Sequence, residues 1–189
     1  MKPLLKMVAL FSVMAAACLA EKIDLGAGKA IHLVLPENWT SDEKPLGETG
    51  LPASIRSLRY ITKSGSNDAV LISIMPVPDE RFADANTLKS MVEQATEQFV
   101  QGSVEGKADL KELKIAGVTG YLVTFTDANL VGKPSVKDDY KALTCCFAFL
   151  GEKTMVTATI FTDDLAGKAY AEGMRIVKSL SLDLPKNAL

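Results

Sequence analysis

The sequence has few of the residue types from which catalytic and metal sites are usually built. Its 189 residues include one histidine, His32, and three cysteines. Zinc sites need three or four converging nitrogen or sulfur ligands, which this composition does not offer. No serine stands in a Gly-x-Ser-x-Gly elbow, and the glycine pair around Val118 lacks the lysine of a phosphate loop. We therefore predict no catalytic residues, no metal and no cofactor, and expect that the protein is not an enzyme.

The sequence also lacks a run of basic residues. Lys and Arg total 21 against 23 Asp and Glu, and the four tyrosines and one tryptophan are not interleaved with basic residues. Nucleic acid and anionic lipid are therefore not expected as partners. With 48% hydrophobic and 23% charged residues, the chain suits one globular domain rather than a disordered segment.

The first twenty residues, MKPLLKMVALFSVMAAACLA, have the pattern of a secretory signal peptide. Lys2 and Lys6 precede an apolar stretch that ends in small residues. That stretch is shorter than the roughly 20 apolar residues of a membrane span. The pattern predicts cleavage between Ala20 and Glu21, an acidic mature chain without a membrane span, and export to the periplasm or medium.

A second interpretation of the same segment makes Cys18 a lipid-attachment site. Three alanines, residues 15 to 17, precede it, and small residues are typical before such cysteines. The mature protein would then be anchored to the cell envelope through Cys18. Both interpretations remain open from the sequence.

Alternating and helical periodicities divide the rest of the chain. The pattern IHLVL at 31 to 35 alternates as a strand does, and Ser64 to Asn67 is a turn between two apolar alternating runs. Asp84 or Asn86 can cap a first helix, and Asp163 or Asp164 a second. The predicted strands lie at 31–35, 56–63, 68–76, 109–117, 118–127, 140–151 and 153–163, and the predicted helices at 84–101 and 163–180.

The order of these elements predicts the fold class. Strands that follow one another through short turns are antiparallel, so the class is α+β. We predict a three-layer α/β/α sandwich, with one mainly antiparallel sheet of six or seven strands and helices on both faces. The single domain would span residues 21–184, between the signal peptide and a tail at 185–189.

Residues 36–56 form the longest predicted loop, and long loops are often functional. Trp39 in this loop would either stack on a ligand or close one end of the core. His32 would act as a base only beside a positioned carboxylate and nucleophile, and otherwise is a half-buried strand residue. These two residues are the candidate ligand or partner surface.

Cys145 and Cys146 are adjacent in the apolar run ALTCCFAFLG. Side chains alternate along a strand, so the two thiols point to opposite faces and cannot converge on a metal. A disulfide between neighbours would distort the strand. We therefore expect both to be buried packing residues, and we expect the sheet to be covered on both faces because neither face of this strand is polar.

Four segments, taken in their order along the chain, match a known family. They are Ile31–Leu35 with Pro36-Glu37-Asn38-Trp39, the helix 87–100, Ile115-Ala116-Gly117-Val118-Thr119-Gly120-Tyr121, and residues 176–182. In these segments the chain resembles the PsbP-like superfamily, which includes PsbP, the Ran-binding Mog protein and DcrB-like small exported proteins. The resemblance implies an antiparallel sheet between helices and a role in binding or assembly without catalysis. It transfers no site residue.

The leading hypothesis is an exported, non-enzymatic binding or assembly-accessory protein of the cell envelope, whose partner is a protein or envelope component. One alternative is a small-ligand carrier or enzyme with a site near the 36–56 loop. The other is a lipid-anchored envelope protein.

Overall fold

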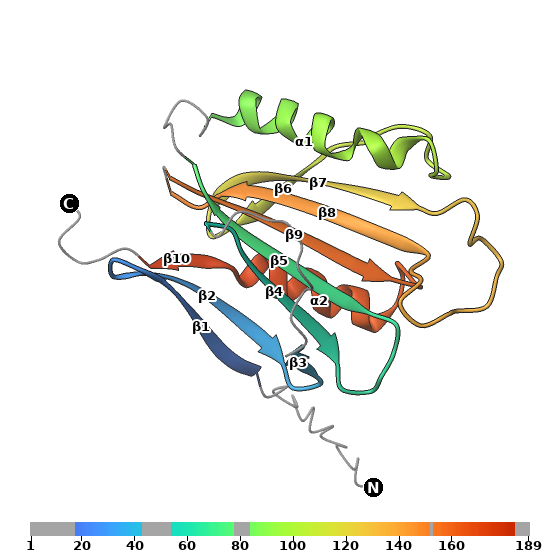
Figure 1. Cartoon of the computed structure of the whole chain (residues 1–189), viewed down its shortest axis with the longest axis horizontal. Helices are drawn as coiled ribbons and strands as arrows, with labels where there is room; N and C mark the ends of the chain where they lie inside the picture. The colour runs from blue at the N-terminus through green and yellow to red at the C-terminus, as the bar shows by residue number, and fades with distance from the viewer. Residues whose placement is uncertain (1–17, 43–53, 78–83, 152, 184–189) are drawn as a thin grey trace, which may run out of the picture.

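The structure is a computed structural model that describes residues 18–42, 54–77, 84–151 and 153–183 (Figure 1). Ten strands and two helices lie in these ranges. In chain order they are β1 Cys18–Gly26, β2 Lys29–Pro36, β3 Trp39–Ser41, β4 Arg56–Thr62, β5 Ala69–Pro76, α1 Ala85–Val100, β6 Lys111–Ile115, β7 Val118–Thr126, β8 Ala142–Phe149, β9 Thr154–Thr162, α2 Lys168–Ser179 and β10 Ser181–Asp183.

The strands form two antiparallel sheets. The larger has seven strands in the order β3-β4-β5-β9-β8-β7-β6, and the smaller has the order β1-β2-β10. Strands β5 and β9 pair in the middle of the larger sheet and join the β4–β5 hairpin to the β6–β9 meander. The α+β class and the antiparallel pairing are confirmed.

The prediction of one sheet was wrong, because the first predicted strand belongs to the smaller sheet. Its neighbour β1 begins at Cys18, inside the segment assigned to the signal peptide, and carries charged residues that obscure its pattern. The other neighbour, β10, has only three residues. Residues 1–17 and 184–189, where the leader and tail are predicted, lie outside the described residues.

Helix α1 packs on β7 and β8. Leu88 and Val92 lie in one apolar cluster with Val123, Phe125 and Cys145. The helix begins as predicted, because the Asp84 side chain accepts hydrogen bonds from two backbone N–H groups of the first turn, at 2.9 and 3.0 Å.

Helix α2 packs within a second cluster, where Ile176 and Val177 lie with Cys146 and Ala158. A Cβ added to Gly173 would lie 3.1 Å from Cγ2 of Ile160, so the helix approaches β9 closely. The same cluster contains core residues of β2, and α2 contacts β2 as well as β9. Helix α2 therefore packs against both sheets. The predicted sandwich did not include the smaller sheet.

The predicted start of the second helix was wrong. The helix begins after Gly167, and the acidic pair precedes it in a turn. Asp164 accepts a hydrogen bond from the backbone of Ala166, and Asp163 accepts one from the side chain of Asn67. The carboxylates thus stabilise the turn and a distant loop instead of capping the helix.

The paired cysteines are packing residues on opposite faces of the larger sheet, as predicted. Cys145 is 5% exposed and belongs to the cluster of α1, whereas Cys146 is 1% exposed and belongs to that of α2. Burial raises the pKa of the Cys145 thiol to about 11 and raises that of Cys146 further. Since the thiolate is the reactive form, neither sulfur is primed for chemistry near neutral pH.

This burial predicts slow thiol labelling. In a Cys18→Ser background at pH 8, we expect Cys145 and Cys146 to react with a thiol-specific chromogenic disulfide about a hundredfold more slowly than free cysteine, because little thiolate is present. The rate should rise as the pH approaches 11. In denaturant both thiols should react as fast as free cysteine. A native-state thiol that labels as fast as free cysteine would contradict this prediction.

Candidate binding site

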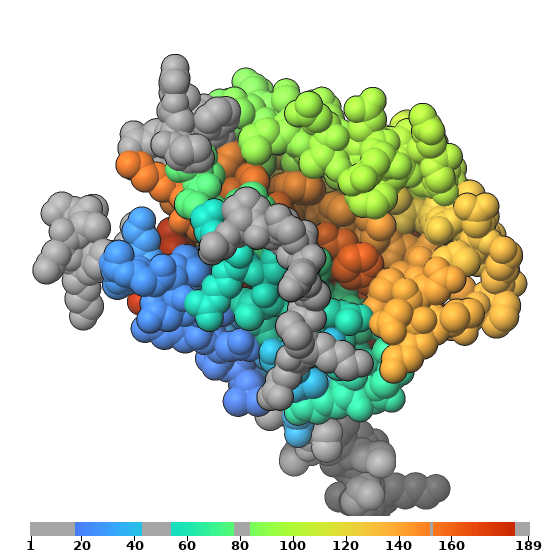
Figure 2. Space-filling view, viewed as in Figure 1, coloured from blue at the N-terminus to red at the C-terminus, as the bar shows by residue number. Residues whose placement is uncertain are grey.

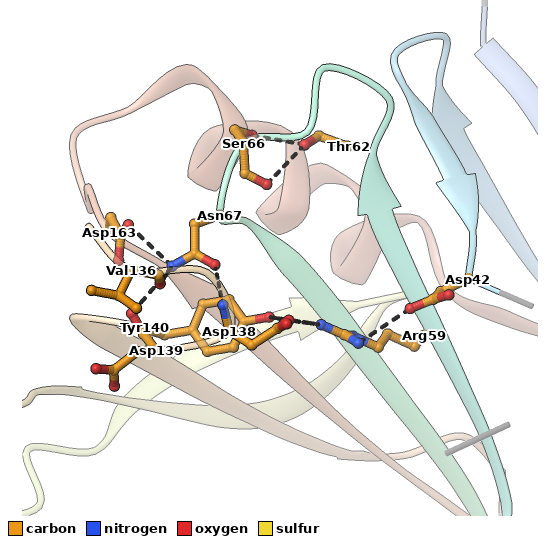
Figure 3. A network of polar contacts seen from close by, with 10 residues as sticks. All are labelled: Asp42, Arg59, Thr62, Ser66, Asn67, Val136, Asp138, Asp139, Tyr140 and Asp163. Atoms are coloured by element: carbon orange, nitrogen blue, oxygen red, sulfur yellow. Dashed lines mark hydrogen bonds and ion pairs between the residues drawn. The ribbon is translucent and has the colours of Figure 1, made fainter. Parts of the chain in front are cut away.

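A groove of ≈ 500 Å³ lies at one end of the larger sheet, where the β4–β5 turn meets the segment between β7 and β8 (Figure 3). We call it the polar groove. Its described lining is Asp42, Arg59, Ile61, Thr62, Gly65, Ser66, Asn67, Asp68, Ser135, Val136, Lys137, Asp138 and Tyr140.

Arg59 of β4 is the central cation of the polar groove. Its guanidinium donates to the carboxylates of Asp42 and Asp138, both at 3.2 Å, and to the hydroxyl of Tyr140 at 2.7 Å. The hydrogen bond from Arg59 holds the pKa of Asp138 below its usual range. One planar donor group therefore links β4 to Asp42, which follows β3, and to the segment before β8.

Asn67 fixes the other wall of the groove. Its side-chain amide donates to the carbonyl oxygens of Val136 and Asp139, at 3.0 and 3.2 Å, and to the carboxylate of Asp163 at 3.1 Å. Its oxygen accepts from the backbone N–H of Asp138 at 3.0 Å. Both ends of one amide are thus used to join the hairpin turn to the segment before β8 (Figure 3).

Tyr140 separates the polar groove from a smaller, more apolar hollow of ≈ 180 Å³ and lines both. The hollow lies between the end of α1 and β7–β8 and includes Phe99, Phe125 and Leu143. The Tyr140 ring packs on Phe161 with centroids 4.9 Å apart. A partner that spans both hollows would therefore meet an aromatic ring between a charged and an apolar surface.

Exposed valines surround these two hollows. Val131 and Val136, in the segment between β7 and β8, are 59% and 57% exposed, and Val104, which follows α1, is also well exposed. The backbone N–H of Val104 donates to Thr126 at 2.8 Å, so the two segments are neighbours. Together they form the right-hand end of the molecule in Figure 2.

Trp39 lies in the core and not at an open site. Its ring is 1% exposed and its indole N–H donates to the Glu172 carboxylate of α2 at 3.1 Å. Asn38 donates to the same oxygen at 2.9 Å, and Lys168 lies 3.6 Å from the other. Burial raises the pKa of Glu172, but these hydrogen bonds and the lysine charge outweigh it, so the pKa lies below its ordinary value.

His32 lies apart from Trp39. It projects from β2 in the smaller sheet, half-exposed, with Nε2 3.6 Å from the carboxylate of Asp183. Its neighbours Ile31 and Leu33 point the other way, into the core that contains Trp39. The structure therefore does not bring the two candidate residues together, and neither is among the described lining residues of the polar groove. A ligand role for either one stays a prediction.

In the described part of the chain, the polar groove gathers groups that can recognise a partner. Across residues 18–42, 54–77, 84–151 and 153–183, no three side chains of His, Cys, Asp or Glu are grouped so that they could hold a metal ion. Within the same ranges, neither helix has the length and apolarity to cross a membrane. What the polar groove offers is a set of fixed donors and acceptors around one aromatic ring, which suits binding.

The sequence did not identify the polar groove. Arg59 and Asp138 are 79 residues apart, and no local pattern links them. The sequence feature that could have indicated this groove is Arg59, a charged residue inside the otherwise alternating strand RSLRYITK. Of the 36–56 loop, the structure describes Pro36 to Asp42 and Ser54 to Arg56, and within it β3 forms the edge of the larger sheet.

Comparison with known proteins identifies the fold. No protein-family model and no curated protein sequence matches the chain. Cyanobacterial PsbP (CyanoP) from Synechocystis sp. PCC 6803 has a similar structure, with a TM-score of 0.54 and 11% identity over 91% of this chain and 96% of that one. The chain therefore has the PsbP-like fold, which confirms the resemblance seen in the sequence.

Two other solved structures have lower scores. The Ran-binding protein Mog1p of Saccharomyces cerevisiae gives a TM-score of 0.45 and 17% identity, over 87% of this chain and 95% of that one. A protein from Bacteroides thetaiotaomicron gives 0.48 and 11%, over 84% of this chain and 46% of that one. At these identities the likeness concerns the fold and not a shared partner.

The Glu172 cluster predicts an acid-sensitive stability contribution. Glu172→Gln should lower the free energy of unfolding at pH 7 by about 1–3 kcal/mol, because it removes the charge shared by the buried Trp39 donor and the half-buried Asn38 donor. A carboxylate whose pKa is depressed by folding stabilises above its unfolded pKa and loses this effect as pH falls through the folded pKa. The difference between wild type and variant, measured by urea unfolding, should therefore shrink below about pH 4.

Glu97→Gln, on the exposed face of α1, is the matched control and should change stability by no more than about 0.5 kcal/mol at either pH. If both substitutions changed the free energy of unfolding equally, the contact of Glu172 on α2 with Asn38 and Trp39 would not depend on the Glu172 charge.

Proposed function

We propose that the protein is an exported, non-enzymatic binding or assembly-accessory protein of the cell envelope, and that a protein partner docks at the polar groove. The observation that supports this most directly is the groove itself, with Arg59 and Tyr140 at its centre and Val136 at its rim. Arginine and tyrosine are enriched at the energetic centres of protein interfaces. Fixed side chains reduce the entropy cost of binding.

The order of the groove adds support. Arg59 is held by three acceptors and Asn67 uses both ends of its amide, so the walls are set before a partner arrives. The neighbouring apolar hollow and the exposed Val131 offer burial of apolar surface beside this polar centre. An interface with an apolar part and a polar, hydrogen-bonded part is the usual anatomy of a protein contact.

The second candidate function, a small-ligand carrier or enzyme with a site near the 36–56 loop, has one observation in its favour. Asp42, from this segment, lines the polar groove, and Ser54 and Arg56 line a second groove at the far end of β4. A role for Trp39 in such a site would require its indole to leave Glu172, whereas His32 is accessible without rearrangement.

The docking proposal predicts a position-specific cross-link. A photo-reactive amino acid at Val136 should give a discrete adduct of higher mass in the cells that make the protein, whereas the same group at exposed Lys89 on α1 should not. Adding Lys137→Glu to the Val136 probe should reduce the adduct several-fold, because a charge changes at the groove. Equal adducts from both positions, or none from Val136, would refute docking at this groove.

We further propose that export proceeds by cleavage after Ala20, with lipid attachment at Cys18 as the alternative. Cys18, Leu19 and Ala20 are exposed in β1, so their removal would leave the core intact. The remaining part of β1 keeps buried Ile23 and the carboxylate of Glu21, which accepts a hydrogen bond from Tyr60 at 3.0 Å. Either form of the N-terminus fits the fold.

The intact mass of the mature protein, purified from the envelope and the medium, separates these alternatives. We expect the mass of a chain that begins at Glu21, with no change in processing when Cys18 is replaced by serine. A mass equal to a chain that begins at Cys18 plus attached acyl groups, lost in Cys18→Ser, would instead establish the lipid anchor.

A further inference from the structure

A second groove, of ≈ 540 Å³, lies at the opposite end of the β4, β5 and β9 strands from the polar groove. We call it the basic groove. Its walls come from the β1–β2 turn, the start of β4, the end of β5 and the start of β9. The described lining is Asp24, Leu25, Gly26, Ala27, Lys29, Ser54, Arg56, Ile74, Met75, Pro76, Lys153 and Thr154.

The charge of this groove is opposite to that of the chain as a whole. Its described lining contains three basic residues, Lys29, Arg56 and Lys153, against one carboxylate, Asp24, whereas the whole chain has a net charge of -2. Cations gathered in a hollow with low-dielectric walls raise the local positive potential. The groove is therefore suited to an anion, whereas the polar groove, with three aspartates against Arg59 and Lys137, is not.

Asp24 offsets only part of the positive charge of this groove, and its carboxylate is held by the β1–β2 turn. One of its carboxylate oxygens accepts from the backbone N–H of Gly26 at 2.8 Å, within the β1–β2 turn. The Arg56 guanidinium donates to the backbone carbonyl of Asp24, which positions the side chain without cancelling its charge. Among the described residues, no carboxylate forms an ion pair with Lys29 or Arg56.

The remaining wall is apolar. Leu25 comes from the smaller sheet, and Ile74, Met75 and Pro76 come from the end of β5. Apolar walls with a few placed charges are typical of sites for small ligands that have a charged group and a hydrocarbon part. We propose that the basic groove binds an amphiphilic anion, through a phosphate or carboxylate headgroup held by Lys29 and Arg56 and an apolar chain along Leu25 and Met75.

Titration calorimetry with the full chain tests this proposal, using octyl phosphate and octanoate below their micelle concentrations. We expect saturable binding of one molecule per chain, weakened by added salt because the contact is ionic. The double variant Lys29→Gln/Arg56→Gln should raise the Kd about tenfold or more. The control Lys22→Gln/Lys107→Gln removes two exposed lysines elsewhere and should leave the Kd unchanged.

Vesicle co-sedimentation distinguishes the source of the anion. Binding to vesicles with 30% phosphatidylglycerol but not to pure phosphatidylcholine, lost in the Lys29/Arg56 double variant, would identify a lipid headgroup. Binding of octyl phosphate without vesicle binding would identify a free amphiphile. No saturable binding of any probe, or equal weakening in the lysine control, would overturn the proposal.

Thermal unfolding checks that each variant is folded. If the loss of the Arg56 contact to β1 unfolds the double variant, the single variant Lys29→Gln is measured in its place. The cross-link at Val136 reports on the other end of the strands, so failure at the basic groove leaves the docking proposal standing, and the reverse also holds.

Discussion

The pleat of β8, buried on both faces, is the constraint on which the rest of the structure depends. Because successive side chains point in opposite directions, Cys145 enters the cluster with α1 and Cys146 the cluster with α2. Both faces of β8 are apolar, and exposing either face to water would be unfavourable, so both faces must be covered. The strand with the adjacent cysteines is thus the centre of the packing, and the two grooves lie at the strand ends.

The strand ends are held by polar contacts between segments far apart in the chain. Arg59 joins Asp42 to Asp138, and Asn67 joins the hairpin turn to the segment before β8. Charge-assisted hydrogen bonds are directional, so they fix the geometry of the groups that they join. The network therefore fixes the shape of the polar groove, from the largely buried Asp42 to the exposed Asp138.

Local periodicity predicted the elements of the larger sheet because each repeats its pattern over several residues. The hairpin around Ser64 and the cap at Asp84 could be read directly. Strand β3 could not be predicted, since three residues do not show a period. The second helix was predicted to begin too early because Asp163 is a typical capping residue, whereas in the structure it accepts a hydrogen bond from Asn67. Most of the groove contacts join residues 69 to 81 positions apart, and no local pattern contains such pairings.

The two grooves differ in charge because the same strands end in different surroundings. At the Arg59 end, the turn and the segment before β8 bring aspartates to a cation in the sheet. At the Arg56 end, the β1–β2 turn uses its aspartate internally and leaves its lysine facing the hollow. Under the two proposals made above, each groove would select its ligand by the charges that line it. One sheet thereby carries two surfaces of different charge, one at each end of its strands.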